Sequence, residues 1–261
     1  MHHGLPAAGD GGAFLGKPIS MEPRTYRHWI EGRDLVPFTV TVRETDLYIR
    51  AATNLQRKAH RLVLKYRKQL ESYIEHNPVF LSSLEPLPTP HDAPNIVKDM
   101  IEAGQKAGVG PMAAVAGAIA EYVGRELLAY SPEVIIENGG DIFMKCLTRR
   151  VIGIFAGKSP LTSKIGLEIE AKDTPLGVCT SSGTVGHSLS FGLADAAVAI
   201  APSATLADAA ATAIGNRARQ ASDIPETIKF SQGIRGLTGA VIIIGENVGA
   251  WGNVRLCETS I

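Results

Sequence analysis

Apolar and polar residues alternate along the first patterned stretch of the chain, between residues 36 and 49. A turn-prone segment at residues 44–46 interrupts the alternation, and the pattern on either side of it is typical of a β-hairpin. We therefore predict two antiparallel strands here, with one face of the hairpin buried. The alternating apolar positions are Val36, Phe38, Val40, Val42, Leu47 and Ile49.

Helical spacing of apolar residues follows the predicted hairpin, from Leu55 to Ile74. Asn54 is placed to cap this helix, and Pro78 to end it. The helix carries many lysine and arginine residues, which we interpret as the solvated face of an amphipathic helix rather than as a binding patch. A proline-rich loop is expected at residues 83–94.

Two further helices are predicted in the middle of the chain and one near residue 210. Asn95 is placed to cap the first, and Pro111 suits the first turn of the second. Ser203 is placed to cap the third, which extends over residues 203–220. One face of the second helix permits very close packing against another backbone, because it consists of alanine and glycine. Its residues are Ala113, Ala114, Ala116, Gly117, Ala120 and Gly124.

Apolar runs bounded by turn residues predict the remaining strands. The segment 133–146 has a Gly139-Gly140 turn at its centre and indicates strand, turn and strand. Further strands are expected within residues 149–157, 164–170, 175–183, 193–202, 238–248 and 252–258. This order of elements favours an α+β fold, with a mixed, largely antiparallel sheet packed with helices. We expect a flexible segment at residues 1–23 and a single domain over residues 24–261, since a hairpin and one helix have too little core to fold alone.

Charge and cysteine content exclude several classes of protein. The 26 basic and 26 acidic residues cancel, whereas nucleic-acid and membrane-surface proteins need a basic excess. The sequence has neither a secretion signal at its start nor a run of about 18 apolar residues, and we expect a cytoplasmic protein that does not bind membranes. Cys146, Cys179 and Cys257 lie far apart without a CxxC motif, which favours reduced thiols.

The helix near residue 210 carries the most informative polar residues. It is apolar almost all round, yet Thr205, Asp208, Thr212 and Asn216 recur at spacings of three and four and form one polar stripe. A buried carboxylate is costly unless it is paired, hydrogen-bonded or bound to a metal. Asp208 and Thr212 together present two oxygens suited to magnesium. The alternative is a structural Asp208 that accepts hydrogen bonds from nearby backbone or from an arginine.

Two glycine-containing turns are the other candidate binding elements. Residues 179–188 contain hydroxyls, glycines and His187, and such turns cradle anions, while His187 is the candidate for proton transfer. An ordinary glycine/serine turn explains this segment equally well. Gly139-Gly140 is either a hairpin turn or a point where a ligand meets the backbone. A weaker hypothesis is a thiol enzyme that uses Cys179. Neither a dinucleotide-binding GxGxxG pattern nor a phosphate-binding P-loop is present.

Four segments in the same order resemble the ApbE superfamily: VGPMAAVAGAIAE, VIIENGGDIF, GVCTSSGTVGHS and LADAAATAI. That superfamily includes magnesium-dependent flavin transferases, which split FAD and attach FMN to a threonine or serine of a target protein. The chain is most similar to an ApbE-like family of cytoplasmic proteins of bacteria and archaea, whose activity is not established. Its ETDL, GPMAAVAG, ENGGD and TSSG–GHS signatures all occur here.

The resemblance implies an ApbE-like fold and assigns roles to particular residues. Asp208 and Thr212 would be magnesium ligands, and Asp195 would be a second carboxylate near the site. A flavin such as FAD or FMN, or another small phosphate-bearing ligand, is the implied partner, and the Ala-rich surfaces are consistent with a homodimer. The residues that would line the ligand site are Gly139, Gly140, Asp141, Thr180, Ser181 and His187.

Two signatures of the flavin transferases are absent from the chain. Their His-x-x-Asp-Pro-x-Thr-Gly segment is replaced by GHSLSFGLAD, and the counterpart of their Asp-x-Gly-Gly-x-x-Lys-Gly helix start contains no lysine. Two alternatives therefore stay open. One is a flavin-binding or phosphate-ligand-binding protein, in the extreme a magnesium-dependent FMN transferase. The other is a non-catalytic ApbE-like scaffold or accessory protein in a metabolic pathway such as sulfur assimilation, with which relatives are associated.

Overall fold

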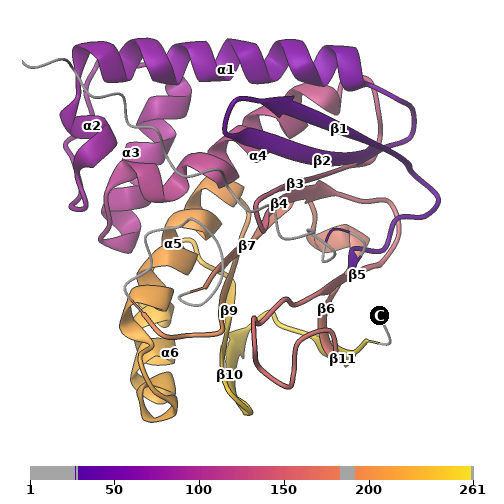
Figure 1. Cartoon of the computed structure of the whole chain (residues 1–261), viewed down its shortest axis with the longest axis vertical. Helices are drawn as coiled ribbons and strands as arrows, with labels where there is room; N and C mark the ends of the chain where they lie inside the picture. The colour runs from indigo at the N-terminus through magenta and orange to yellow at the C-terminus, as the bar shows by residue number, and fades with distance from the viewer. Residues whose placement is uncertain (1–26, 28, 183–191, 260–261) are drawn as a thin grey trace, which may run out of the picture.

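An eight-stranded antiparallel sheet organises the computed structural model, which describes residues 27, 29–182 and 192–259. Helices cover one face of this sheet, and a three-stranded sheet lies on its other side (Figure 1). The large sheet has the order β1-β2-β3-β4-β7-β8-β9-β10 and the small one β11-β6-β5. The expected α+β class with a largely antiparallel sheet is confirmed. The strands are β1 (Val36–Val42), β2 (Thr45–Ala51), β3 (Val134–Asn138), β4 (Asp141–Lys145), β5 (Arg150–Gly153), β6 (Ile165–Ile169), β7 (Leu176–Ser181), β8 (Ala196–Ala201), β9 (Gly239–Ile244), β10 (Asn247–Gly252) and β11 (Leu256–Glu258).

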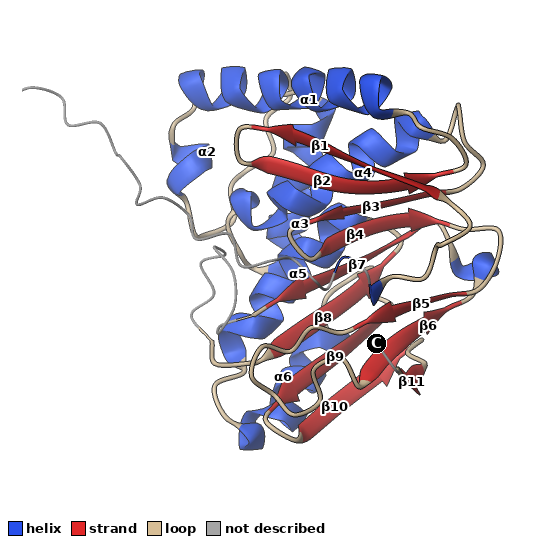
Figure 2. Cartoon of the chain, turned by 45° about the vertical axis from the view of Figure 1, so that its right-hand side comes forward, coloured by secondary structure: helices blue, strands red, loops and turns tan. Residues whose placement is uncertain are grey.

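The helices gather behind the large sheet when the molecule is viewed from the strand side (Figure 2). They are α1 (Gln56–His76), α2 (Val79–Ser82), α3 (Asn95–Ala107), α4 (Val115–Leu127), α5 (Ala204–Arg217) and α6 (Ile224–Gln232), with 3-10 turns η2 (Pro111–Ala114), η3 (Ala171–Asp173) and η4 (Ala221–Asp223). The three helices expected from apolar spacing after α1 correspond to α3, η2–α4 and α5. The sequence pattern did not indicate α6, because its buried face consists only of Ile224, Thr227 and Ser231.

Local hydrogen bonds confirm some of the predicted element ends and correct others. The Ser203 hydroxyl accepts a bond from the Leu206 amide at 3.3 Å and caps α5, as predicted. Asn95 is not a cap: it is the first residue of α3, and Pro94 occupies the capping position without a side-chain bond. The β1–β2 turn falls one residue earlier than expected, since Arg43 adopts a φ of +52° and Val42 pairs directly with Thr45.

Each face of the large sheet has its own apolar core. Alternate side chains of β3 and β4 point to opposite faces: Ile136 and Phe143 pack beneath the helices, while Ile135 and Ile142 pack against the three-stranded sheet. The Ala-rich surfaces expected to be available to a partner are used inside the molecule, because α5 is buried on nearly all sides. A homodimer stays a prediction. Among the described residues, no single helix is long and apolar enough to span a membrane, and α3 with η2–α4 passes that test only as a pair bent by 104°.

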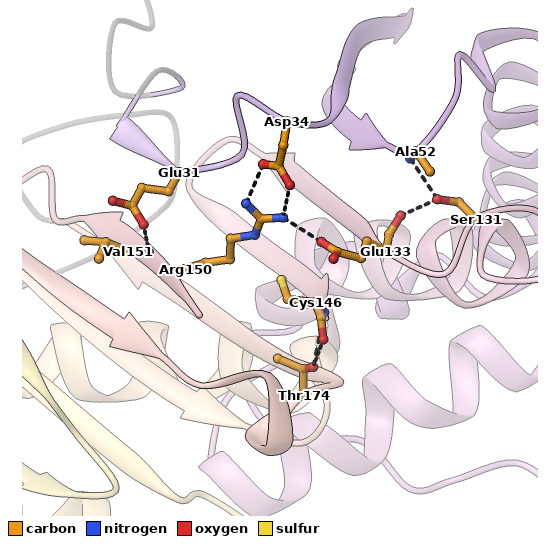
Figure 3. A network of polar contacts seen from close by, with 9 residues as sticks. All are labelled: Glu31, Asp34, Ala52, Ser131, Glu133, Cys146, Arg150, Val151 and Thr174. Atoms are coloured by element: carbon orange, nitrogen blue, oxygen red, sulfur yellow. Dashed lines mark hydrogen bonds and ion pairs between the residues drawn. The ribbon is translucent and has the colours of Figure 1, made fainter. Parts of the chain in front are cut away.

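A buried arginine joins the segment before β1 to both sheets (Figure 3). The Arg150 guanidinium donates to the two Asp34 carboxylate oxygens at 2.6 and 2.7 Å, and to Glu133 at 2.7 Å. Arg150 and Glu133 are both buried, so the charge of Glu133 depends on Arg150 for compensation, while Arg150 is also paired with Asp34. In the same region burial raises the pKa of the Cys146 thiol to about 11. All three cysteines are free, as expected.

Candidate functional site

The β3–β4 turn, the start of α4 and the middle of α5 meet on the helix side of the large sheet. The turn is formed by Gly139 and Gly140, whose φ values of +68° and +106° favour glycine. Buried Glu137 secures it: one carboxylate oxygen accepts a bond from the Gly140 amide at 2.9 Å, and the other from Arg27 at 2.7 Å. The Asn138 side chain donates to the Ala116 carbonyl at 3.0 Å and ties the turn to the start of α4.

Asp208 is a buried carboxylate on α5 that reaches the backbone of α4. Its Oδ2 accepts a hydrogen bond from the Gly117 amide at 2.8 Å. Burial raises the pKa of Asp208 to about 7, against the opposing effect of the Gly117 and Ala116 backbone groups. A structural role of Asp208, as an acceptor of a backbone hydrogen bond, therefore accounts for one carboxylate oxygen, and this bond holds α4 and α5 together. It leaves open what compensates the negative charge at neutral pH.

Asp141 is a second buried carboxylate at the same place. It is the first residue of β4, 7% exposed, and its Oδ1 has no hydrogen-bond partner in the described part of the chain. Burial, and next the negative charge of Asp208, raise the pKa of Asp141 well above its usual range. Neither carboxylate forms an ion pair with a lysine, arginine or histidine of the described residues. The site thus concentrates two acidic groups that repel one another.

β7 supplies the neighbouring polar side chains. Cys179 is fully buried, and its Sγ donates to the Ala204 carbonyl at 3.4 Å. Burial, with the added repulsion of Asp141 and Asp208, raises the pKa of the Cys179 thiol, which disfavours the nucleophilic thiolate. The geometry therefore speaks against a thiol enzyme. Ser181, 4% exposed, has a hydroxyl that finds no hydrogen-bond partner within residues 27, 29–182 and 192–259, and Thr180 is half-buried beside the Gly140 turn.

The predicted polar stripe on α5 divides into parts with different roles. The Thr205 hydroxyl donates to Glu121 at 3.0 Å, while Asp208 reaches Gly117. Thr212, one turn beyond Asp208, is half-buried. Asp195 lies at the same edge of the sheet, but its carboxylate accepts a bond from the Gly245 amide in the β9–β10 turn at 2.8 Å. His187, the candidate for proton transfer, lies outside the described residues.

Glu121 is a buried residue of this region that the sequence reasoning missed. From α4, its Oε2 accepts bonds from the Ser203 hydroxyl at 2.8 Å and from the Thr205 amide at 3.0 Å. Its other oxygen accepts from Arg125 at 2.6 Å. Glu121 therefore holds the N-terminus of α5, just as Asp208 holds the start of α4. A carboxylate on the Ala-rich face of α4 was the available signal, because such a position is buried wherever two helices pack closely.

The donor set at the site suits a hard cation. Within the described part of the chain, no group of three or more His, Cys, Asp and Glu side chains is able to hold a metal ion. Magnesium needs only one or two protein carboxylates, because water and ligand phosphates complete its shell. The Asp208 carboxylate, the Thr212 hydroxyl and the unsatisfied Asp141 oxygen are all oxygen donors of the required kind. The residues present therefore fit magnesium rather than zinc or iron.

Comparison with known proteins identifies the family. A family model described as "AbpE bacteria" matches residues 27–230. A "UPF0280 protein" of Methanocella arvoryzae is 46% identical over 193 residues, which are 74% of this chain and 78% of the relative. A second UPF0280 protein, of Methanococcus aeolicus, is 43% identical over 216 residues, 81% of this chain and 84% of its own. The predicted family is confirmed.

Solved structures of flavin transferases share the fold at low sequence identity. ApbE of Vibrio cholerae superposes with a TM-score of 0.57 at 11% identity, covering 84% of this chain and 96% of its own. The Pseudomonas stutzeri flavinyl transferase ApbE, in its apo form, gives 0.55 at 12% identity, covering 87% of this chain and 94% of its own. At these identities the likeness establishes an ApbE-like fold.

Proposed function

The chain belongs to the ApbE-like family described as AbpE bacteria, and on this premise we propose that it binds a phosphate-bearing ligand, foremost a flavin nucleotide, together with magnesium. Two observations support the proposal. The chain has the fold of flavin transferases, and a pair of buried carboxylates lies beside a glycine turn without a counter-cation among the described residues. The carboxylate pair carries more weight, because it belongs to this chain itself.

In the proposed complex, Asp208 and Thr212 hold the cation from α5. The bound ion would neutralise phosphate charge beside the two carboxylates and stabilise their ionised forms. The hydrogen bond from Gly117 orients Asp208 and leaves its second oxygen for the ion. Because the ion compensates the negative charge of the carboxylates, a phosphate group can bind at this position.

The nucleotide is proposed to lie along the β3–β4 turn and the end of β7. Gly139 and Gly140 have no side chains, and nothing in the structure lies within 4 Å of a Cβ built at Gly139. A ligand can therefore approach the backbone there closely. At the end of β7, the Ser181 hydroxyl has no hydrogen-bond partner among the residues that the structure describes, and Thr180 lies next to it in the strand. Together with Asp141, these residues form the proposed ligand site; His187, which the family resemblance also assigns to it, lies outside the described residues.

Binding of FAD and FMN to the purified chain tests the proposal. Flavin fluorescence titrations are compared with magnesium present and with the cation removed by a chelator. We expect saturable binding that requires magnesium, and at least tenfold weaker binding for Asp208→Asn. Asp92→Asn is the control, because Asp92 is an exposed aspartate of the loop before α3. The absence of any flavin binding by folded wild-type protein would contradict the proposal.

A non-catalytic scaffold or accessory protein is the second candidate function. The two missing transferase signatures favour it, since one of them leaves only His187 and the other lacks its lysine. Incubation of the protein with FAD and magnesium distinguishes the candidates. Release of AMP, or covalent transfer of FMN to a threonine- or serine-containing acceptor, identifies an enzyme. Magnesium-dependent binding without turnover identifies a binding protein.

A further inference from the structure

Asp141 and Asp208 approach each other from opposite layers of the molecule. β4 and β7 pair with Ile142 opposite Val178, so the preceding residue of β4, Asp141, lies beside Cys179. The Cys179 thiol contacts the Ala204 carbonyl, and Asp208 is one turn further along α5. The sheet and the helix each place one carboxylate at their common boundary.

Two buried oxygens at this boundary lack hydrogen-bond partners among the described residues. They are Asp141 Oδ1 and Ser181 Oγ, on side chains that are 7% and 4% exposed. Ser181 is two residues beyond Cys179 in β7, and residues two apart in a strand face the same side of the sheet. Both therefore point towards the helix layer that carries Asp208. Buried polar atoms in proteins nearly always have a hydrogen-bond partner. Two buried oxygens without one, beside a pair of carboxylates, therefore indicate a binding position for a ligand.

We propose that Asp141 is a ligand of the cation, so that the ion is held between β4 and α5 rather than by α5 alone. This inference rests on the proposed function, which assigns the cation to Asp208 and Thr212. It adds a second carboxylate from the sheet, and it places the Ser181 hydroxyl beside the ion as a donor to a ligand or to a water in its shell. The class of ion is a hard divalent cation of the magnesium type, because every donor is oxygen.

Asp141 and Glu137 differ in how many of their carboxylate oxygens accept hydrogen bonds, as expected if Asp141 binds a cation. Glu137, four residues earlier and also buried, has both carboxylate oxygens occupied, by Gly140 and by Arg27. Asp208 also has an amide donor, from Gly117. Among the described residues, Asp141 Oδ1 is a fully buried carboxylate oxygen without a hydrogen-bond partner. A residue that served only the turn would use its oxygens there, whereas a cation ligand needs one free.

Binding of Mn²⁺ as a probe for magnesium tests this assignment. Free Mn²⁺ is measured by electron paramagnetic resonance in titrations of the wild-type chain, Asp141→Asn, Asp208→Asn and the exposed control Asp92→Asn. Circular dichroism of each variant without metal checks that it is folded. We expect both Asp141→Asn and Asp208→Asn to weaken Mn²⁺ binding by at least the roughly 10- to 100-fold that loss of an outer partner of a metal ligand costs. Asp92→Asn should bind as the wild type does.

The outcomes separate this inference from the proposed function. Weaker binding in Asp208→Asn alone overturns the role of Asp141 and leaves the proposed function standing. Unchanged binding in both variants, or no binding by the wild type, overturns both. If Asp141→Asn does not fold, the ¹³C-carboxyl signals of aspartate-labelled wild type are followed instead in a titration with diamagnetic Mg²⁺, which shifts the carboxyl carbons that ligate it. Shifts of two buried aspartates support the inference, and a shift of only one contradicts it.

Discussion

The Asp208 carboxylate on α5 accepts a hydrogen bond from the Gly117 amide of α4 across 2.8 Å, and the two helix backbones touch at this point. A Cβ added at Gly117 would clash with the Ala204 carbonyl and lie 2.8 Å from the Asp208 Cβ. Glu121 completes the arrangement in the other direction by binding the N-terminus of α5. Each helix is thus held by a carboxylate of the other, and the position of Asp208 depends on this contact.

Gly117→Ala should destabilise the protein by about 1–3 kcal/mol, the usual cost of forcing an extra carbon into a packed interior. The reason is that the nearest obstacles are the α5 backbone and the Cβ of Asp208, neither of which is a flexible side-chain end. Urea unfolding measures the loss. Gly233→Ala is the matched control, because its added Cβ meets nothing closer than 3.3 Å. Equal stability of Gly117→Ala and the wild type would contradict the close contact.

Glu121→Ala should destabilise the protein by about 1.5–3 kcal/mol, the range for a hydrogen bond to a charged group. The reason is that the Thr205 amide, at the N-terminus of α5, loses its acceptor. It should also weaken Mn²⁺ binding, because α5 carries Asp208. Arg125→Ala is the control, because Arg125 donates to Glu121 and, among the described residues, makes no hydrogen bond to α5. Its effect on Mn²⁺ affinity is expected to be small. A Glu121→Ala variant with full Mn²⁺ affinity would show that the hydrogen bonds from α5 to Glu121 do not position Asp208.

The raised pKa of Asp208, about 7, makes stability depend on pH in the absence of divalent cations. Between about pH 4, where an unfolded aspartate titrates, and pH 7, the native state binds the extra proton. The free energy of unfolding therefore falls as pH rises through this window, by up to about 1.4 kcal/mol per unit. Urea unfolding of wild type and Asp208→Asn should show their difference shrinking from pH 5 to pH 7 as the wild type loses its advantage. A difference that does not change with pH would contradict the shift.

Metal binding should have the opposite pH dependence. A cation requires the ionised carboxylate, so Mn²⁺ affinity should increase from pH 6 to pH 8 as Asp208 loses its proton. Titrations at several pH values measure the change. The Asp208→Asn variant should lack it. An affinity that is constant over this range would mean that the ion is held by groups that do not titrate there.

Arg150→Ala should cost about 3–5 kcal/mol, because it leaves Glu133 buried without its counter-charge. The adjacent Arg149→Ala supplies the control. Arg149 is half-exposed and pairs with Glu168 near the surface, where such a pair is worth at most about 1 kcal/mol. Thermal or urea unfolding of the two variants measures the contrast. Similar losses in both would contradict the distinction between the buried and the exposed pair.

Most strands and the long helices were predictable because their patterns are local. The single strand expected at residues 238–248 is wrong, since a turn at Gly245 divides it into β9 and the start of β10. The hairpin at residues 36–49 and the Gly139-Gly140 turn lie where alternation and glycine content place them. The close packing at Gly117 followed from the Ala/Gly face of α4. The prediction that Asn95 caps α3 was wrong. An asparagine before an apolar run is typical of a cap, but Pro94 occupies that position here.

The site itself depends on contacts between residues far apart in the chain, which no local pattern encodes. Spacing along α5 identified Asp208 as a buried carboxylate, but Asp141 reaches it only through the pairing of β4 with β7. The partner of Asp208 is the Gly117 amide, 91 residues earlier. The position of Glu121 on the Ala-rich face of α4 indicates burial, but its partners on α5, Ser203 and Thr205, follow only from the packing of the two helices. Side-chain spacing finds candidates, and the tertiary fold decides which of them meet.

Anomalous diffraction from a crystal grown with Mn²⁺ and FAD is the most direct test of the proposed cation site. The account predicts one Mn²⁺ peak between α5 and the start of β4, within about 2.0–2.3 Å of an Asp208 oxygen, with the flavin phosphates on its open side. A flavin bound elsewhere, or a Mn²⁺ peak remote from Asp208 while that carboxylate keeps only its bond to Gly117, would contradict it.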